Sequence, residues 1–115
     1  MPPTLADRLV HILRSIDAIQ QLLAGRTLET FKNDLFLRLA VERSFEIISE
    51  ASRRISDEVK AAHADIDWAG IASLGNQLRH AYHSIDVEIL WTIAEKDLPP
   101  LRIFAEKVIR DEQRK

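Results

Sequence analysis

Apolar residues recur every three or four positions along most of this chain, which is the spacing of amphipathic helices. The first such stretch has apolar residues at Leu5, Leu9, Ile12, Leu13, Ile16, Ile19 and Leu23. Thr4 and Asp7 form a variant capping box at its start, with aspartate in place of the usual glutamate. Gly25 is expected to end the helix, because glycine readily adopts the left-handed conformation beyond a helix terminus. The pattern predicts a long first helix between these signals, with polar Gln20 as its one interruption.

A second long helix is predicted from about Asp34 to Ile55, after a short turn at residues 28–32 that Thr27 could cap. Asn33 is the predicted cap of this long helix. Its inward stripe comprises Leu37, Ala40, Val41, Phe45, Ile48 and Ala51, with Phe36 and Ile47 broadening it. Charged residues fill much of the other face, so one side of the helix should pack inside the protein. Ser56 then opens another short turn.

Three further helices are predicted in the second half of the chain, each preceded by an aspartate that could cap it. These aspartates are Asp67, Asp86 and Asp97, and their helices should cover about residues 68–82, 87–95 and 98 onward. Pro99 and Pro100 fall in the first turn of the last helix, where proline is tolerated. The residues expected to face inward from the last two helices are Ile89, Leu90, Ile93, Leu101, Ile103, Phe104 and Val108.

The connections between these helices are short, which favours antiparallel neighbours. A chain of 115 residues can bury one sizeable core. Three glycines and an aromatic share of 6% argue against an all-β fold. The predicted fold is therefore all-α, an up-and-down antiparallel bundle of four to five helices in one domain, residues 1–115.

Composition limits the chemistry that this chain can perform. It has no cysteine, which excludes disulfides and thiolate chemistry and indicates a reducing, cytoplasmic setting. Its start lacks the pattern of a signal peptide, and no apolar run approaches the roughly 20 residues that cross a bilayer. The formal net charge is −2, so contact with RNA would have to come from a local basic patch.

The richest candidate chemistry lies between Gly75 and His83. In a helix, Asn76, His80 and His83 would share one face, and Arg79 would stand beside them. Histidine changes charge near neutral pH, whereas arginine keeps its charge, so the two could perform acid–base chemistry on a phosphate. The spacing leaves open a structural role for His80 and a simple ion pair for Arg79.

Two poor helix formers, Gly75 and Asn76, stand side by side in this segment. They indicate an interruption of the helix, a closely approaching ligand, or another helix packed against the glycine. A metal site is not expected, because no carboxylate lies in helical register with His80 and His83, and no cofactor motif is present. His11 and His63 have no evident partners and receive no role.

The segment from Gly75 to Tyr82, followed by Ile85 and Asp86, resembles the signature of HepT-like proteins of the HEPN superfamily. Further stretches that fit this family are residues 40–51, residues 68–71, and Leu90-Trp91 leading to Asp97-Leu98-Pro99. The resemblance implies a helical bundle that forms a homodimer through its motif-bearing helices. It also implies the toxin of a type VII-like toxin–antitoxin pair, a metal-independent ribonuclease acting on RNA. The implied partner is an MNT-type nucleotidyltransferase antitoxin, which transfers AMP to the motif tyrosine, here Tyr82.

One departure from the family pattern affects the expected site. Gly75 occupies the position of the motif arginine, five residues before His80. Arg79, from the same or the partner subunit, would then have to supply the cation. With His80 moving the proton, Arg79 stabilising the phosphate charge and Asn76 positioning it, the chain would cleave RNA by attack of the 2′-hydroxyl. The alternatives are a non-catalytic dimer that serves as partner and substrate of the nucleotidyltransferase, and a helical adaptor without a site.

Overall fold

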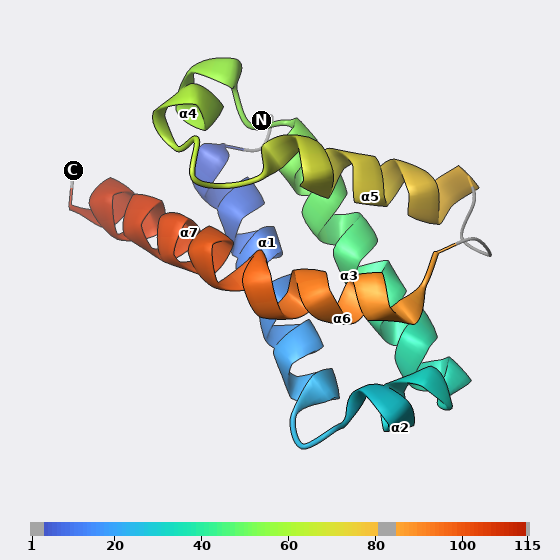
Figure 1. Cartoon of the computed structure of the whole chain (residues 1–115). Helices are drawn as coiled ribbons and strands as arrows, with labels where there is room; N and C mark the ends of the chain where they lie inside the picture. The colour runs from blue at the N-terminus through green and yellow to red at the C-terminus, as the bar shows by residue number, and fades with distance from the viewer. Residues whose placement is uncertain (1–3, 81–84, 115) are drawn as a thin grey trace.

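Every regular element in the described part of the chain is an α-helix (Figure 1). The computed structural model describes residues 4–80 and 85–114. The longer helices there are α1 (Leu5–Leu23), α3 (Leu35–Arg53), α5 (Trp68–His80), α6 (Val87–Lys96) and α7 (Leu98–Gln113). Two short helices, α2 (Leu28–Lys32) and α4 (Asp57–Ala62), lie between them. The prediction of an all-α bundle is confirmed.

Helix starts and stops follow local chemistry in the first half of the chain. Thr4 and Asp7 form the predicted capping box, with reciprocal hydrogen bonds of 2.9 and 3.1 Å between backbone N–H groups and side-chain oxygens. Gly25 follows α1 with a φ of +71°, a conformation that favours glycine. The predicted cap Asn33 is wrong, because Asp34 accepts the hydrogen bond from the backbone of Leu37. The amide of Asn33 instead donates to a backbone carbonyl of α2.

The three predicted aspartate caps differ in what they do. The Asp67 carboxylate accepts a hydrogen bond of 2.9 Å from the backbone N–H of Gly70, and Asp86 accepts one of 2.9 Å from Glu88. Asp97 occupies the cap position of α7 without a capping hydrogen bond from its side chain. Two of the three therefore satisfy backbone donors that a helix start leaves unpaired.

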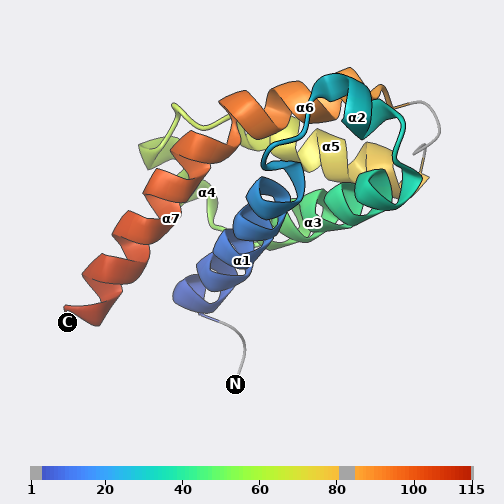
Figure 2. The same ribbon diagram turned by 90° about the horizontal axis from the view of Figure 1, so that it is seen from below.

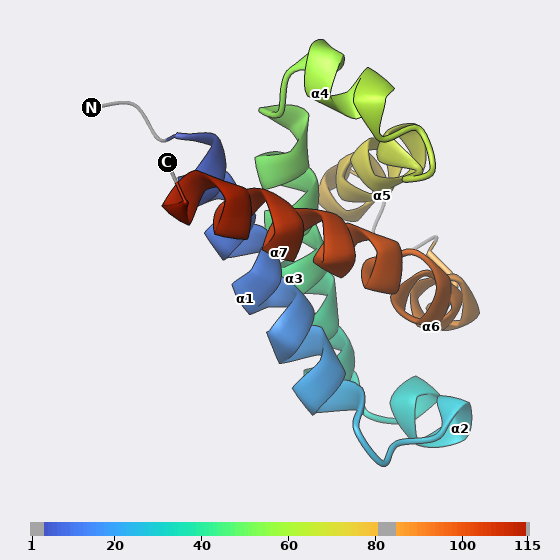
Figure 3. The same cartoon turned by 90° about the vertical axis from the view of Figure 1, so that its left-hand side faces the viewer.

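Helix α3 lies at the centre of the bundle. It packs against α1 on one side and α5 on the other, and α7 packs against α1 (Figure 3). Helices α1 and α3 run antiparallel, and α2 lies in the segment that joins them (Figure 1). Helix α1 begins and α7 ends on the same side of the molecule (Figure 2). The largest fully buried hydrophobic side chains are Phe31, Leu9, Ile12, Ile16, Ile19, Ile48, Leu90, Leu98, Leu101 and Val41.

Three residues predicted to face the core lie at the surface. Phe36 is 82% exposed, Ile103 is 68% exposed and Ile89 is 51% exposed. Each directly precedes a buried residue in the sequence, and successive helical residues point about 100° apart. The inward prediction was wrong at these positions because the apolar stripe on each helix is narrower than the run of apolar residues. Among the described helices, none has the length and apolarity needed to cross a membrane.

Candidate functional site

The polar motif occupies the end of α5. Asn76, Arg79 and His80 are all exposed there, while Leu74 and Leu78 are buried and hold the opposite side of the helix against the core. Asn76 and His80 stand one turn apart, so they share a face. The structure therefore brings these three predicted site residues to one exposed helix end, where a ligand could reach them.

Arg79 is tied to the central helix. Its Nη1 donates a hydrogen bond of 3.2 Å to Oε2 of Glu50, on α3, and its side chain is 36% exposed. The other carboxylate oxygen of Glu50 accepts a hydrogen bond of 3.2 Å from Arg54. That hydrogen bond and the charges of Arg54 and Arg79 hold the pKa of the Glu50 carboxyl below its ordinary value, although desolvation acts in the opposite direction. A guanidinium has five N–H donors, so Arg79 can hold Glu50 and still donate to an anion.

Gly75 is the contact point between α5 and α3. A Cβ atom on residue 75 would lie 1.9 Å from Oγ and 2.3 Å from Cβ of Ser49, which is far closer than atoms can approach. Ser49 is itself only 1% exposed, and its hydroxyl has no hydrogen-bond partner among the described residues. Helix α5 continues without a break through residue 75. Of the explanations that the sequence left open, helix packing against the glycine accounts for its presence.

This packing also explains why position 75 has no room, with the backbone as it is, for the arginine that the family resemblance implies there. A side chain at position 75 would point into α3, where Ser49 fills the space. Arg79 lies four residues, about one helical turn, beyond Gly75 on the side of α5 that faces α3, and its side chain reaches Glu50. Among the described residues of α5, Arg79 is the arginine that precedes His80 in the sequence.

The chain after the motif is anchored to α3 as well. The backbone carbonyl of Ile85 accepts a hydrogen bond of 2.8 Å from Nη2 of Arg38, and Nε of Arg38 donates one of 2.6 Å to Glu42. Glu42 and Ile85 are both buried. The ion pair between Arg38 and Glu42 was not predicted from the sequence, although their spacing of four residues is a signal for an ion pair on a helix. Tyr82 and His83, which the sequence singled out, lie outside the described residues.

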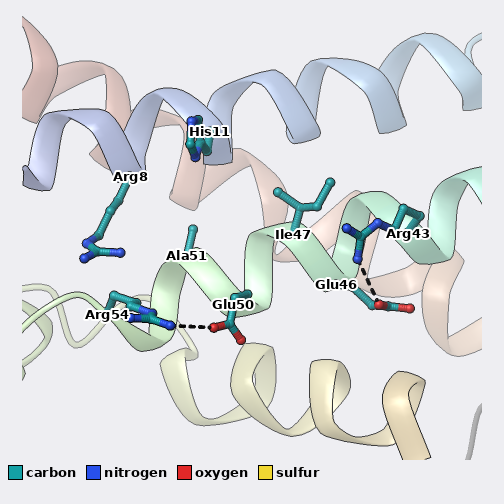
Figure 4. A pocket seen from close by; sticks show the side chains of 8 residues that line it. All are labelled: Arg8, His11, Arg43, Glu46, Ile47, Glu50, Ala51 and Arg54. Carbon is teal, nitrogen blue, oxygen red and sulfur yellow. Dashed lines mark hydrogen bonds and ion pairs between the residues drawn. The ribbon is translucent and has the colours of Figure 1, made fainter. Parts of the chain in front are cut away.

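A groove of about 430 Å³ lies between α1 and α3 (Figure 4). Its lining consists of Arg8, His11, Arg43, Glu46, Ile47, Glu50, Ala51 and Arg54. Glu50 connects it to the motif, because the same carboxylate holds Arg79. Neither a role for His11 nor this groove could be predicted from the sequence, since the lining residues come from two helices that only tertiary packing brings together.

The fold and the site define a helical bundle that presents an asparagine, an arginine and a histidine at the end of one helix. Residues 12–108 match the family model described as Ribonuclease HepT-like, and the chain belongs to this family. The resemblance read from the separated motifs is thereby confirmed.

Relatives of known description match nearly the whole chain. A protein of Thermococcus cleftensis named "Probable ribonuclease HepT" is 35% identical over 102 residues, which cover 89% of this chain and 93% of the relative. A protein of Caldanaerobacter subterraneus subsp. tengcongensis, whose name describes a candidate RNase, is 30% identical over 105 residues. That match covers 91% of this chain and 94% of the relative. No solved structure matches the chain.

Proposed function

We propose that this chain is a metal-independent endoribonuclease and the toxin of a toxin–antitoxin pair. The observation that carries this proposal is the exposure of Asn76, Arg79 and His80 together at the end of α5. Membership of the HepT-like family and the ribonuclease names of the relatives support RNA as the substrate. A cytoplasmic location, where RNA is available, agrees with the absence of cysteine from the chain.

The proposed reaction is an internal transfer at one phosphate of the RNA strand. His80 accepts the proton of a 2′-hydroxyl, and the resulting oxygen attacks the adjacent phosphorus. The bond from phosphorus to the 5′-oxygen breaks, and the 5′-oxygen takes up the proton that His80 carries, which returns the imidazole to its starting state. The products are a 2′,3′-cyclic phosphate and a 5′-hydroxyl, so no water or metal-bound group enters this step.

Arg79 and Asn76 would act on the phosphate. The guanidinium of Arg79 would donate to the non-bridging oxygens, on which negative charge accumulates during attack. The carboxamide of Asn76, one turn from His80, would position the phosphate or the imidazole. The ion pair with Glu50 supports this assignment, because it holds Arg79 in a limited range of positions before RNA binds.

A homodimer through the motif-bearing region would bring two copies of the site together. Leu35, Phe36 and Leu39 are exposed at the start of α3, the helix that also holds Arg79 through Glu50. Exposed apolar residues in a group are typical of protein–protein contacts. In such a dimer, Arg79 of one subunit could serve His80 of the other.

The implied control of the toxin is covalent. An MNT-type nucleotidyltransferase antitoxin would transfer AMP to Tyr82, with the phenol oxygen attacking the α-phosphorus of ATP and pyrophosphate leaving. The adduct would place a bulky anion two residues from His80 and would repel RNA phosphates. The family resemblance alone supports this part of the proposal.

The test is cleavage of RNA by purified protein in excess chelator. Wild-type protein should produce fragments ending in cyclic phosphate, and His80→Ala should lose at least ~100-fold in rate, the usual contribution of general acid–base catalysis. Ser73→Ala is a matched control, because Ser73 is exposed on the same helix and has no part in the reaction. Absence of cleavage by the wild type would refute the enzymatic proposal.

A second candidate function is a non-catalytic dimer that serves as substrate of the nucleotidyltransferase. The observation that favours it is Gly75, which occupies the position of the family arginine and contacts Ser49. This candidate predicts a gain of one AMP on Tyr82 when the protein is incubated with the antitoxin and ATP, together with no cleavage of RNA. Loss of the mass gain in Tyr82→Phe would identify the acceptor.

A further inference from the structure

Two arginines share one carboxylate beside the motif. Arg54, the residue directly after α3, and Arg79 on α5 each donate to Glu50 over 3.2 Å, and each uses a different carboxylate oxygen. One negative charge therefore stands between two fixed positive charges. This arrangement leaves a net positive charge on the surface where α3 and α5 meet.

The positive surface extends across α3 into the groove against α1. Figure 4 shows Arg8 reaching from α1 toward the end of α3 that carries Arg54. In the described part of the chain, Arg8 forms no ion pair, and the nearby Asp7 carboxylate is held by Thr4 at the start of α1. At the other end of the groove, Arg43 is paired with Glu46 at 3.2 Å. The end of the groove that Glu50 joins to the motif therefore holds more positive than negative charge.

Arg8, Arg54 and Arg79 form a row that carries three positive charges. The carboxylate of Glu50 neutralises one of them. The chain as a whole has a formal net charge of −2. A local basic row on an acidic protein directs a polyanion to one place instead of attracting it everywhere. The groove lined by Arg8 and Arg54 also has an apolar floor, to which Ile47 and Ala51 contribute.

We propose that the Arg8–Arg54–Arg79 row binds successive phosphates of a single RNA strand as that strand leaves the His80 site. The inference rests on the proposed function and assigns the path of its substrate. A groove of about 430 Å³ has the size of a small-molecule site, which suits one nucleotide of the strand at a time. Ile47 and Ala51 receive the apolar side of the ribose or base, while the arginines hold phosphate oxygens.

Glu50 has a defined part in this arrangement. In the free protein its carboxylate holds Arg54 and Arg79 close together despite their like charge. When RNA binds, phosphate oxygens accept hydrogen bonds from the guanidinium N–H groups that are not bonded to Glu50. Because contacts to phosphates carry no sequence information, the row supplies affinity and direction but no choice of base.

The experiment measures binding of a fluorescent single-stranded RNA whose 2′-hydroxyls are methylated, so that it cannot be cleaved by 2′-hydroxyl attack. Arg8→Gln and Arg54→Gln should each weaken binding ~3- to 10-fold. Each should also reduce the slope of log affinity against log salt by about 0.7, the value for one lost phosphate contact on a single strand. Arg110→Gln, which removes an exposed arginine of α7, is the matched control and should bind as the wild type does.

The outcomes separate this inference from the proposed function. Binding by Arg8→Gln and Arg54→Gln within twofold of the wild type, or no binding by the wild type, would overturn the phosphate path even if His80-dependent cleavage is observed. Weakened binding by both variants in a protein that does not cleave RNA would support the path and refute the enzyme. Tighter binding of a duplex of the same length would overturn the assignment to a single strand. Circular dichroism of each variant establishes that its helices are intact.

Discussion

Replacing Gly75 by alanine tests the closest contact between the motif helix and the rest of the protein. The added Cβ would lie 2.3 Å from Cβ of Ser49 and 1.9 Å from its Oγ. Rotation of the Ser49 hydroxyl could relieve only the contact with Oγ, since the Cβ position is set by the backbone of α3. The two helices must therefore move apart, or the side chains must leave their preferred geometry.

The size of the effect follows from two opposing contributions. Carbon atoms in contact are separated by about 3.5–4.0 Å, so the helices would have to separate by roughly 1 Å or more at this point. Overpacking of this kind costs about 1–3 kcal/mol. Alanine in place of glycine within a helix recovers about 1 kcal/mol. We expect the free energy of unfolding to fall by about 1 kcal/mol, with Tm lower by roughly 3–6 °C.

Urea denaturation followed by circular dichroism, at one fixed protein concentration, measures this free energy. Ser73→Ala on the exposed side of α5 is the control and should be neutral or slightly stabilising. In the double variant Ser49→Gly/Gly75→Ala, the nearest remaining Ser49 atom is Cα at 3.8 Å, an ordinary contact. The double-mutant cycle should therefore give a favourable coupling of about 1–2 kcal/mol. If Gly75→Ala matches or exceeds the stability of the wild type, the close crossing of α3 and α5 is refuted.

Three further predictions concern charge, capping and assembly. Burial and then the charge of Asp67 raise the pKa of Asp97 above 3.8, so the native state binds its proton more tightly than the unfolded state does. The free energy of unfolding should fall as pH rises from 3.8 through the raised pKa of Asp97. At pH 7 Asp97→Asn should be more stable than the wild type, and this difference should disappear below pH 3.8. An equal difference in stability at both pH values would contradict the raised pKa. Asp34→Ala removes the side chain that accepts from Leu37 at 3.0 Å and should lower the free energy of unfolding by about 1 kcal/mol in urea, whereas Asn33→Ala should have the smaller effect. Phe36→Ser should convert a dimer to a monomer in light scattering without loss of helical signal, because Phe36 is exposed; a monomeric wild type would disprove the proposed dimer surface.

Helix starts and ends could be predicted from sequence because they depend on residues that are close together in the chain. The reciprocal hydrogen bonds of Thr4 and Asp7 span three residues, and Gly25 needs only its own backbone freedom. The failure at Asn33 arose because Asp34 is an equally good cap, and local chemistry does not choose between neighbours. Phe36 was predicted to be inside because it is apolar, but the direction of its side chain depends on which side of α3 the other helices cover.

For the site, the sequence by itself determined that Asn76, Arg79 and His80 would lie on neighbouring positions of one helix, since residues three and four apart are neighbours on a helix surface. Only the tertiary structure decided that Glu50, 29 residues before Arg79, would hold that arginine, and that Ser49 would leave no room for a side chain at Gly75. The periodicity of a helix specifies which residues share its face, but the angle and distance at which two helices cross depend on how all their side chains pack together. Those contacts join distant parts of the chain, and no local pattern contains them.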